Sequence, residues 1–140
     1  MWKRLVVIAV FALMGAAAVF IIAAQRRPSD LGLQNGQLRP CPSTPNCVST
    51  QADPGTLEDG LHRAKLALAA LPRTTLVEQS GPYLRAESRT ESGIFADDVE
   101  LLIDAESSLV HFRSASRIGG GDMGVNRARM EAFRAAWEGQ

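Results

Sequence analysis

The sequence predicts an α+β domain behind an amino-terminal transmembrane helix, with the domain's elements in the order α-β-β-β-β-α. An uncharged apolar run comes first, and two later stretches repeat apolar residues at helical spacing. Between these two stretches, residues 74–118 alternate apolar and polar side chains, as half-buried strands do. We therefore expect a small antiparallel four-stranded sheet with two helices on one face.

The apolar run extends from Leu5 to Ala24, which is 20 residues without charge or proline. At about 1.5 Å per residue it spans roughly 30 Å, the thickness of a bilayer's hydrocarbon core. A cleavable signal peptide is the alternative, but its apolar region is usually about 7–15 residues long, so we favour an anchor. Two cations flank each end of the run, and the amino group adds charge to the first. The positive-inside rule then predicts a cytoplasmic amino terminus and a domain on the outer side of the membrane. We expect a single-pass protein of the bacterial cytoplasmic (inner) membrane with a periplasmic domain.

The part of the chain from residue 28 onward carries 11 Lys and Arg against 15 Asp and Glu, a net charge of −4. This mildly acidic balance argues against nucleic-acid binding and against polybasic adhesion to a membrane surface. We assign residues 1–27 to the anchor, residues 28–40 to a glycine- and proline-containing linker, and residues 41–140 to the domain. The expected partners are the lipid bilayer, through the first helix, and an unknown envelope protein or small anionic ligand.

Cys41 and Cys47 are the two cysteines of the chain and lie in a proline-rich loop. In an oxidising compartment, such a pair most simply forms a disulfide. A metal site would need further ligands, and His62 and His111 stand apart from any ligand spacing, so we expect no metal and no cofactor. Lipid attachment is disfavoured because small residues do not precede Cys41. A nucleophilic Cys47 with His111 as its base stays an alternative.

The first helix of the domain is expected to begin at Thr56, which can cap its first turn, and to end before Pro72. Its apolar stripe comprises Leu57, Leu61, Ala64, Leu68 and Leu71. His62 lies beside this stripe, so we expect it to be exposed. The last helix is expected over residues 123–138, with Asp122 as its N-cap. Its apolar stripe comprises Met130, Phe133 and Trp137.

The four strands are predicted at about residues 74–78, 83–90, 98–104 and 109–118. A tight hairpin through Glu106 and Ser107 sets the register of the last two strands. It places Asp104 opposite Leu109, Leu102 opposite His111, Glu100 opposite Arg113 and Asp98 opposite Ala115. Five polar residues then share the face away from the core, namely Asp98, Glu100, His111, Arg113 and Arg117. This face is either a solvated surface with cross-strand ion pairs or one wall of a polar pocket.

A glycine turn at residues 119–124 spells G-x-G-x-x-G between the last strand and the last helix. We do not interpret it as a dinucleotide site, because that site needs a βαβ unit and an acidic residue about 20 positions further on. The polar groups at the turn are Arg117, Asp122, Asn126 and Arg127. They form either a fold-closing network, with Asp122 as partner of one arginine, or an anion site at the helix N-terminus.

Three stretches together resemble the domain-of-unknown-function 1499 family: residues 40–50 with both cysteines, Asp97-Asp98-Val99-Glu100, and residues 114–129. The resemblance covers residues 38–138 and implies a small bacterial or plastid protein, often membrane-anchored or exported, with no agreed activity. Carried onto this chain, the family's pattern points to Cys41, Cys47, Asp98, Arg117, Asp122, Asn126 and Arg127. The family often has a larger residue and a serine where this chain has Gly120 and Gly121, which leaves only backbone there for a ligand.

The function expected from the sequence is a binding or assembly module that is not an enzyme, on the outer side of the membrane. An anchor is present, no catalytic triad is recognisable, and the polar residues group on one face. The alternatives are a thiol-dependent or other hydrolase that uses Cys47 with His111, and a purely structural envelope protein.

Overall fold

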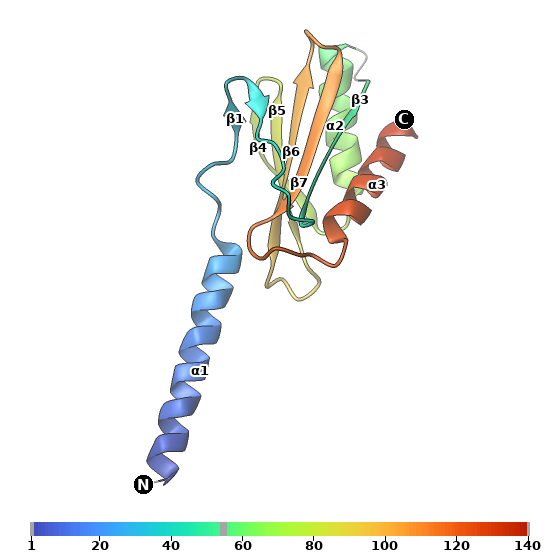
Figure 1. Ribbon diagram of the computed structural model, residues 1–140. Coiled ribbons are helices and arrows are strands. Elements are labelled where there is room, and N and C mark those ends of the chain that lie inside the picture. Colours follow the sequence, from blue (N-terminus) through green and yellow to red (C-terminus); the bar gives the residue numbers. More distant parts are fainter. Residues whose placement is uncertain (1, 54–55, 140) are drawn as a thin grey trace.

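The computed structural model describes residues 2–53 and 56–139 (Figure 1). Its elements are α1 Trp2–Gln25, β1 Leu33–Gln34, β2 Gln37–Leu38, β3 Cys47–Ala52, α2 Leu57–Ala70, β4 Thr74–Ser80, β5 Tyr83–Arg89, β6 Ala96–Asp104, β7 Leu109–Ser116 and α3 Val125–Glu138. The predicted α+β class with an apolar amino-terminal helix is confirmed. The strand count is not, because the described part of the chain has a five-stranded sheet and a separate two-stranded hairpin.

The five strands form an antiparallel sheet in the order β3-β7-β6-β5-β4. The prediction of four strands was wrong because it left β3 in the proline-rich loop. The loop's prolines end at Pro45, and β3 then pairs with β7 from Cys47 opposite Ala115 to Ala52 opposite Val110. This strand is short and rich in polar residues, so its sequence pattern is weak, and pairing with β7 determines its conformation.

Both helices of the domain cover the same face of the sheet, as Figure 1 shows for α2 and α3. The stripes of the two helices meet the inward residues of β5, β6 and β7 in one buried core. At its centre the ring of Phe133 stacks on Phe112 with centroids 4.3 Å apart, and on Trp137 with centroids 5.9 Å apart. Burying each such side chain contributes about 1.5–3 kcal/mol. The side chain of Leu57 lies outside the described residues.

The register predicted for β6 and β7 is confirmed at all four pairs, including Glu100 with Arg113 and Leu102 with His111. The cap predicted for α2 is also confirmed, because the Thr56 side chain accepts from the N–H of Asp59. His62 is exposed on this helix, as expected.

The predicted start of α3 was wrong, because the helix begins at Val125, with Gly124 as its N-cap. Met123 and Gly124 have φ of 53° and 82°. These left-handed conformations cannot be part of a right-handed helix, so helical geometry starts at Val125, two residues after the predicted start. Asp122 nevertheless accepts from the N–H of Asn126 at 2.7 Å, and its carboxylate thus satisfies one donor of the first turn.

Among the described residues, α1 is long and apolar enough to cross a membrane, although a signal sequence has the same properties. It contains the whole run Leu5–Ala24, and its side chains are exposed up to Ala23. The helix extends away from the domain, and the segment that follows it continues beside the sheet and forms the hairpin of β1 and β2 (Figure 1). In this hairpin β2 lies against β6.

Candidate functional site

The polar face of the sheet holds a group of buried ion pairs centred on Asp98. Arg117 binds this carboxylate at two points, with Nε 2.8 Å from Oδ2 and Nη2 2.9 Å from Oδ1. Arg85 donates from Nη1 to Asp98 Oδ1 at 3.1 Å, and Arg117 Nη2 also donates to Glu87 Oε1 at 2.7 Å. The side chains of Asp98 and Arg117 are each 2% exposed, so these charges compensate one another away from water.

Glu100 forms a second buried ion pair beside the first. Arg113 Nη1 donates to Glu100 Oε2 at 2.8 Å. Glu100 Oε1 accepts from the hydroxyl of Tyr83 and from the backbone N–H of Gly32, both at 2.9 Å. Gly32 precedes β1, and the carbonyl of Gln25, at the end of α1, accepts from Arg117 Nη1 at 2.6 Å. The segment before the domain therefore helps to cover the ion pairs, and their interpretation as a solvated sheet surface is wrong.

The electrostatics of this face hold the ion pairs in their charged forms. The hydrogen bond to Asp98 raises the pKa of Arg117 further above its ordinary value. Burial acts to raise the pKa of Glu87, but the hydrogen bond and charge of Arg117 outweigh it, and the pKa of Glu87 lies below its ordinary value of 4.5. Burial raises the pKa of the Tyr83 phenol, and the negative charge of Glu100 raises it further, so Tyr83 stays a neutral donor.

A separate buried cluster is built around Asn126, at the start of α3. Its Oδ1 accepts from Ser114 Oγ and from Arg129 Nη1, both at 2.6 Å. Its Nδ2 lies within hydrogen-bond distance of Asp122 Oδ2 at 2.8 Å, Ser116 Oγ at 2.9 Å and the Asn46 carbonyl at 3.1 Å. These contacts join α3 to β7 and to the residue before β3. The fold-closing interpretation of the glycine turn thus fits this geometry.

The prediction that Asp122 pairs with Arg117 or Arg127 was wrong. Asp122 accepts instead from Asn126 and from the N–H of Gly124, and these hydrogen bonds outweigh burial and place the pKa of the carboxyl below its ordinary value. Arg127 is exposed on the next position of α3. The arginine that enters the cluster is Arg129, whose Nη2 also lies 2.7 Å from Asp97 Oδ2.

Two adjoining pockets open between β3, β7 and the segment that links β2 to β3. Their volumes are about 530 Å³ and 360 Å³, and both are lined by Arg39, Pro40 and Arg113. Polar side chains of the sheet face the larger one, namely Ser49, Thr50, Gln51 and His111. Thr44, Asn46 and the cysteine pair line the smaller one. We call the two together the Arg39–Arg113 pocket.

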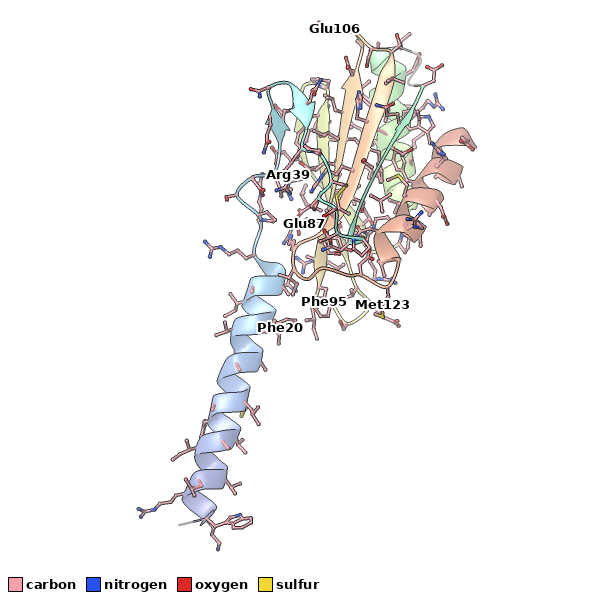
Figure 2. All side chains as sticks on the ribbon, viewed as in Figure 1. Phe20, Arg39, Glu87, Phe95, Glu106 and Met123 are labelled. Carbon is pink, nitrogen blue, oxygen red and sulfur yellow. A yellow bond between two sulfur atoms is a disulfide. The ribbon has the colours of Figure 1, made fainter. Side chains whose placement is uncertain are left out.

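The two arginines of this pocket keep hydrogen-bonding capacity that the described residues do not use. Arg113 is bonded to Glu100 and Arg39 to Asp30, yet the buried Nε of each has no hydrogen-bond partner there. The side chain of Arg113 is 3% exposed. Burial lowers the pKa of Arg39, and the positive charge of Arg113 lowers it further. The positive charges of Arg39 and Arg113 therefore repel each other across a polar pocket. Each of the two guanidinium groups also has an N–H donor that no described residue accepts. Figure 2 shows Arg39 beside the sheet, on the segment that links β2 to β3.

The structure does not bring together the residues of the thiol-hydrolase alternative. The sulfurs of Cys41 and Cys47 lie at disulfide distance, 2.10 Å, with Cα atoms 5.5 Å apart. Cys47 is opposite Ala115 in the sheet, whereas His111 is opposite Gln51. Four strand residues, roughly 13 Å, thus separate the thiol from its intended base. His111 contacts Gln51 Nε2 through Nδ1 at 3.2 Å and lies 3.7 Å from Asp104.

Sequence reasoning missed several residues of these sites. Arg85 and Glu87 lie two residues apart on β5, and in the sheet they are opposite Glu100 and Asp98 of β6. The loop between β5 and β6 is too long for the sequence to predict this register. No sequence signal marks Arg39, because its role depends on where the linker packs. Within residues 2–53 and 56–139, no group of three or more His, Cys, Asp or Glu could hold a metal ion.

Comparison with protein-family models finds a match over residues 37–137 to the family described as "Protein of unknown function (DUF1499)". The matched region runs from β2 into the last turn of α3, and so includes the ion pairs, the Asn126 cluster and the pocket. No curated protein sequence matches the chain.

Proposed function

We propose, from the premise that this chain belongs to the DUF1499 family of proteins of unknown function, that it is a membrane-anchored binding module for a small anion. The ligand is a phosphate- or carboxylate-bearing molecule held in the Arg39–Arg113 pocket. The observation that carries the proposal is the side chain of Arg113, which is 3% exposed, lines the pocket and keeps a buried Nε without a partner in the described chain.

An anion in the pocket would supply hydrogen-bond acceptors and a negative charge to Arg39 and Arg113. A buried donor without a partner costs about 1–3 kcal/mol, so a side-chain shift that brings either Nε to an acceptor in the pocket would be favoured. Each guanidinium has five N–H donors and one carboxylate partner among the described residues, so donors are left for a second acceptor. A negative group between Arg39 and Arg113 would also offset the repulsion from Arg113, which adds to the effect of burial in lowering the pKa of Arg39. Arginine prefers phosphate and carboxylate as acceptors because their geometry matches its planar fork.

Inorganic phosphate is expected to raise the melting temperature of the purified full chain. At a phosphate concentration tenfold above Kd, binding stabilises the folded state by about 1.4 kcal/mol, and each kcal/mol raises Tm by about 4–8 °C in a domain of this size. The measurement is thermal unfolding in detergent with phosphate against chloride at equal ionic strength.

The matched variants for this experiment are Arg113→Gln and Arg127→Gln. The first removes the pocket arginine and should abolish the rise in Tm with phosphate. The second removes an exposed arginine of α3 and should keep the rise. Equal responses in the two variants would mean that phosphate acts by general ion effects, and no response in the native chain would favour the structural envelope protein instead.

The second part of the proposal is that α1 is retained as an anchor and that the domain lies on the outer side of the membrane. The length and apolar composition of α1 support anchoring, and the flanking charges support this orientation. Disulfide distance between Cys41 and Cys47 fits an oxidising compartment.

Orientation is tested by labelling intact cells with a membrane-impermeant maleimide. We expect no labelling of Cys41 and Cys47 until an impermeant reductant opens the bridge, and then labelling without lysis. The variant with both cysteines changed to serine supplies the blank. Labelling that requires lysis of the cells would show the domain on the cytoplasmic side.

A further inference from the structure

The domain carries an apolar patch at the end nearest α1. The patch, which we call the apolar rim, consists of Phe95, Ile118, Met123 and Val125. Met123 is fully exposed, at 103%, and Val125 and Phe95 are 41% and 37% exposed. The rim residues come from three separate stretches of chain, yet all line one pocket of about 340 Å³. Phe20 of α1 lines the same pocket.

The contact between Phe20 and Phe95 sets the level of the rim along α1. The two rings meet edge to face with centroids 5.9 Å apart. Phe20 precedes Ala24, the last residue of the apolar run, by four residues, which is about 6 Å along the helix. The rim therefore lies level with the last turns of the apolar run. Figure 2 shows Phe95 and Met123 at this end of the domain, near Phe20, and Glu106 at the opposite end.

The loop that carries Phe95 is attached directly to the end of α1. The side-chain amide of Gln25 donates to the carbonyls of Gly93 and Ile94, both at 2.6 Å, and the Gln25 oxygen accepts from Arg89. The backbone carbonyl of Gln25 accepts from Arg117. These contacts fix the apolar rim beside the end of α1. If α1 spans a membrane, the rim therefore lies at the membrane surface from which α1 emerges.

We infer that the apolar rim inserts between the acyl chains of the lipid leaflet from which α1 emerges. This inference rests on the proposed retention of α1 as an anchor. The rim shares a pocket and an aromatic contact with the apolar run itself, so the lipid that surrounds Phe20 is continuous with the lipid at Phe95. The exposed Arg26, which directly follows α1, then lies at the level of the headgroups.

The carboxylates near the rim do not oppose this placement. Asp97 and Asp122 line the same pocket, but each is engaged, Asp97 with Arg129 and Asp122 with Asn126. Their charges are therefore neutralised or hydrogen-bonded within the domain and are not left facing the acyl chains. The domain would thus rest on the membrane through the rim, with its opposite end, at Glu106, in water.

The test places a fluorescent label on the full chain in phosphatidylcholine vesicles. Met123→Cys is labelled with a thiol-reactive environment-sensitive dye, while Cys41 and Cys47 stay bridged and do not react. Glu106→Cys, at the opposite end of the domain, is the matched control, and both positions are exposed. Lipids with a nitroxide near the headgroup then quench any dye that enters the leaflet.

We expect a blue-shifted emission at position 123 and severalfold stronger quenching by the nitroxide lipid than at position 106. Equal quenching at the two positions, in protein that floats with the vesicles, overturns the inference and leaves the anchor intact. A blue shift without lipid quenching that grows with the ratio of protein to lipid shows a second copy on the rim, and also overturns it. Protein that fails to float with the vesicles overturns the anchor proposal, and this inference with it.

Discussion

Replacing Asp98 with alanine is expected to lower the free energy of unfolding by about 3–5 kcal/mol, the usual cost of breaking a buried ion pair from one side. Asp98 is the shared acceptor of Arg85 and Arg117, and Arg117 alone binds both of its carboxylate oxygens. Without Asp98, the guanidinium of Arg117, whose side chain is 2% exposed, keeps Glu87 as its one carboxylate partner among the described residues. Urea unfolding followed by circular dichroism, with the disulfide intact, measures the change.

Two further variants separate burial from charge. Glu138 is exposed and forms an ion pair with Arg134 at 3.9 Å, so Glu138→Ala should change stability by no more than about 0.5 kcal/mol. The double change Asp98→Ala with Arg117→Met removes the uncompensated cation and should recover part of the loss. A loss in Asp98→Ala no larger than in Glu138→Ala would mean that water reaches these ion pairs.

Replacing Asn126 with alanine is expected to cost about 2–4 kcal/mol, because one buried amide serves five partners from different parts of the chain. The change removes the side-chain amide donor from Asp122, Ser116 and the Asn46 carbonyl, although Asp122 keeps the backbone N–H of residue 126, and it removes the acceptor of Ser114 and Arg129. Chemical unfolding of the full chain in detergent again provides the measurement.

The neighbouring Arg127→Ala is the control for the Asn126 prediction. Arg127 lies one position further along α3 and is exposed, so its loss should fall within about 0.5 kcal/mol. The family resemblance points to both residues, whereas the structure gives a buried role to Asn126. Equal losses in the two variants would contradict the assignment of the cluster as the feature that closes the fold.

The two buried networks also shape the proposed binding pocket. Glu100 accepts a hydrogen bond from Arg113 and fixes the position of this arginine. Tyr83 and the backbone of Gly32 donate to Glu100 and fix its carboxylate in turn. On the other side, Asn126 binds the carbonyl of Asn46, a residue that lines the smaller part of the pocket. The ion pairs are therefore better understood as the support of the pocket than as its binding surface. Asp98→Ala lowers stability without touching the pocket, so it cannot test the ligand. Arg113→Gln also breaks a buried ion pair, and for that reason the quantity compared with Arg127→Gln is the rise in Tm caused by phosphate, not Tm itself.

The sequence alone determined the elements whose signals are local. The apolar run of α1, the stripes and cap of α2, and the register set by the tight hairpin of β6 and β7 depend on residues close together in the chain. A period of 3.6 or 2 residues is visible within such a window. The nearness of Cys41 and Cys47 is local in the same sense, since six positions separate them.

Tertiary structure alone decided which polar residues are buried and what they contact. The sheet face that carries Asp98 and Glu100 has the alternation of a solvated surface, and it is buried because a segment 68 residues before Glu100 packs over it. Asn126 reaches the carbonyl of Asn46 across 80 residues. Strand β3 likewise forms because it pairs with the distant β7, and Arg39 lines the pocket because the segment before β3 packs beside Arg113. Burial depends on what covers a side chain, and in this protein the covering segments are distant in the sequence, where no local pattern records them.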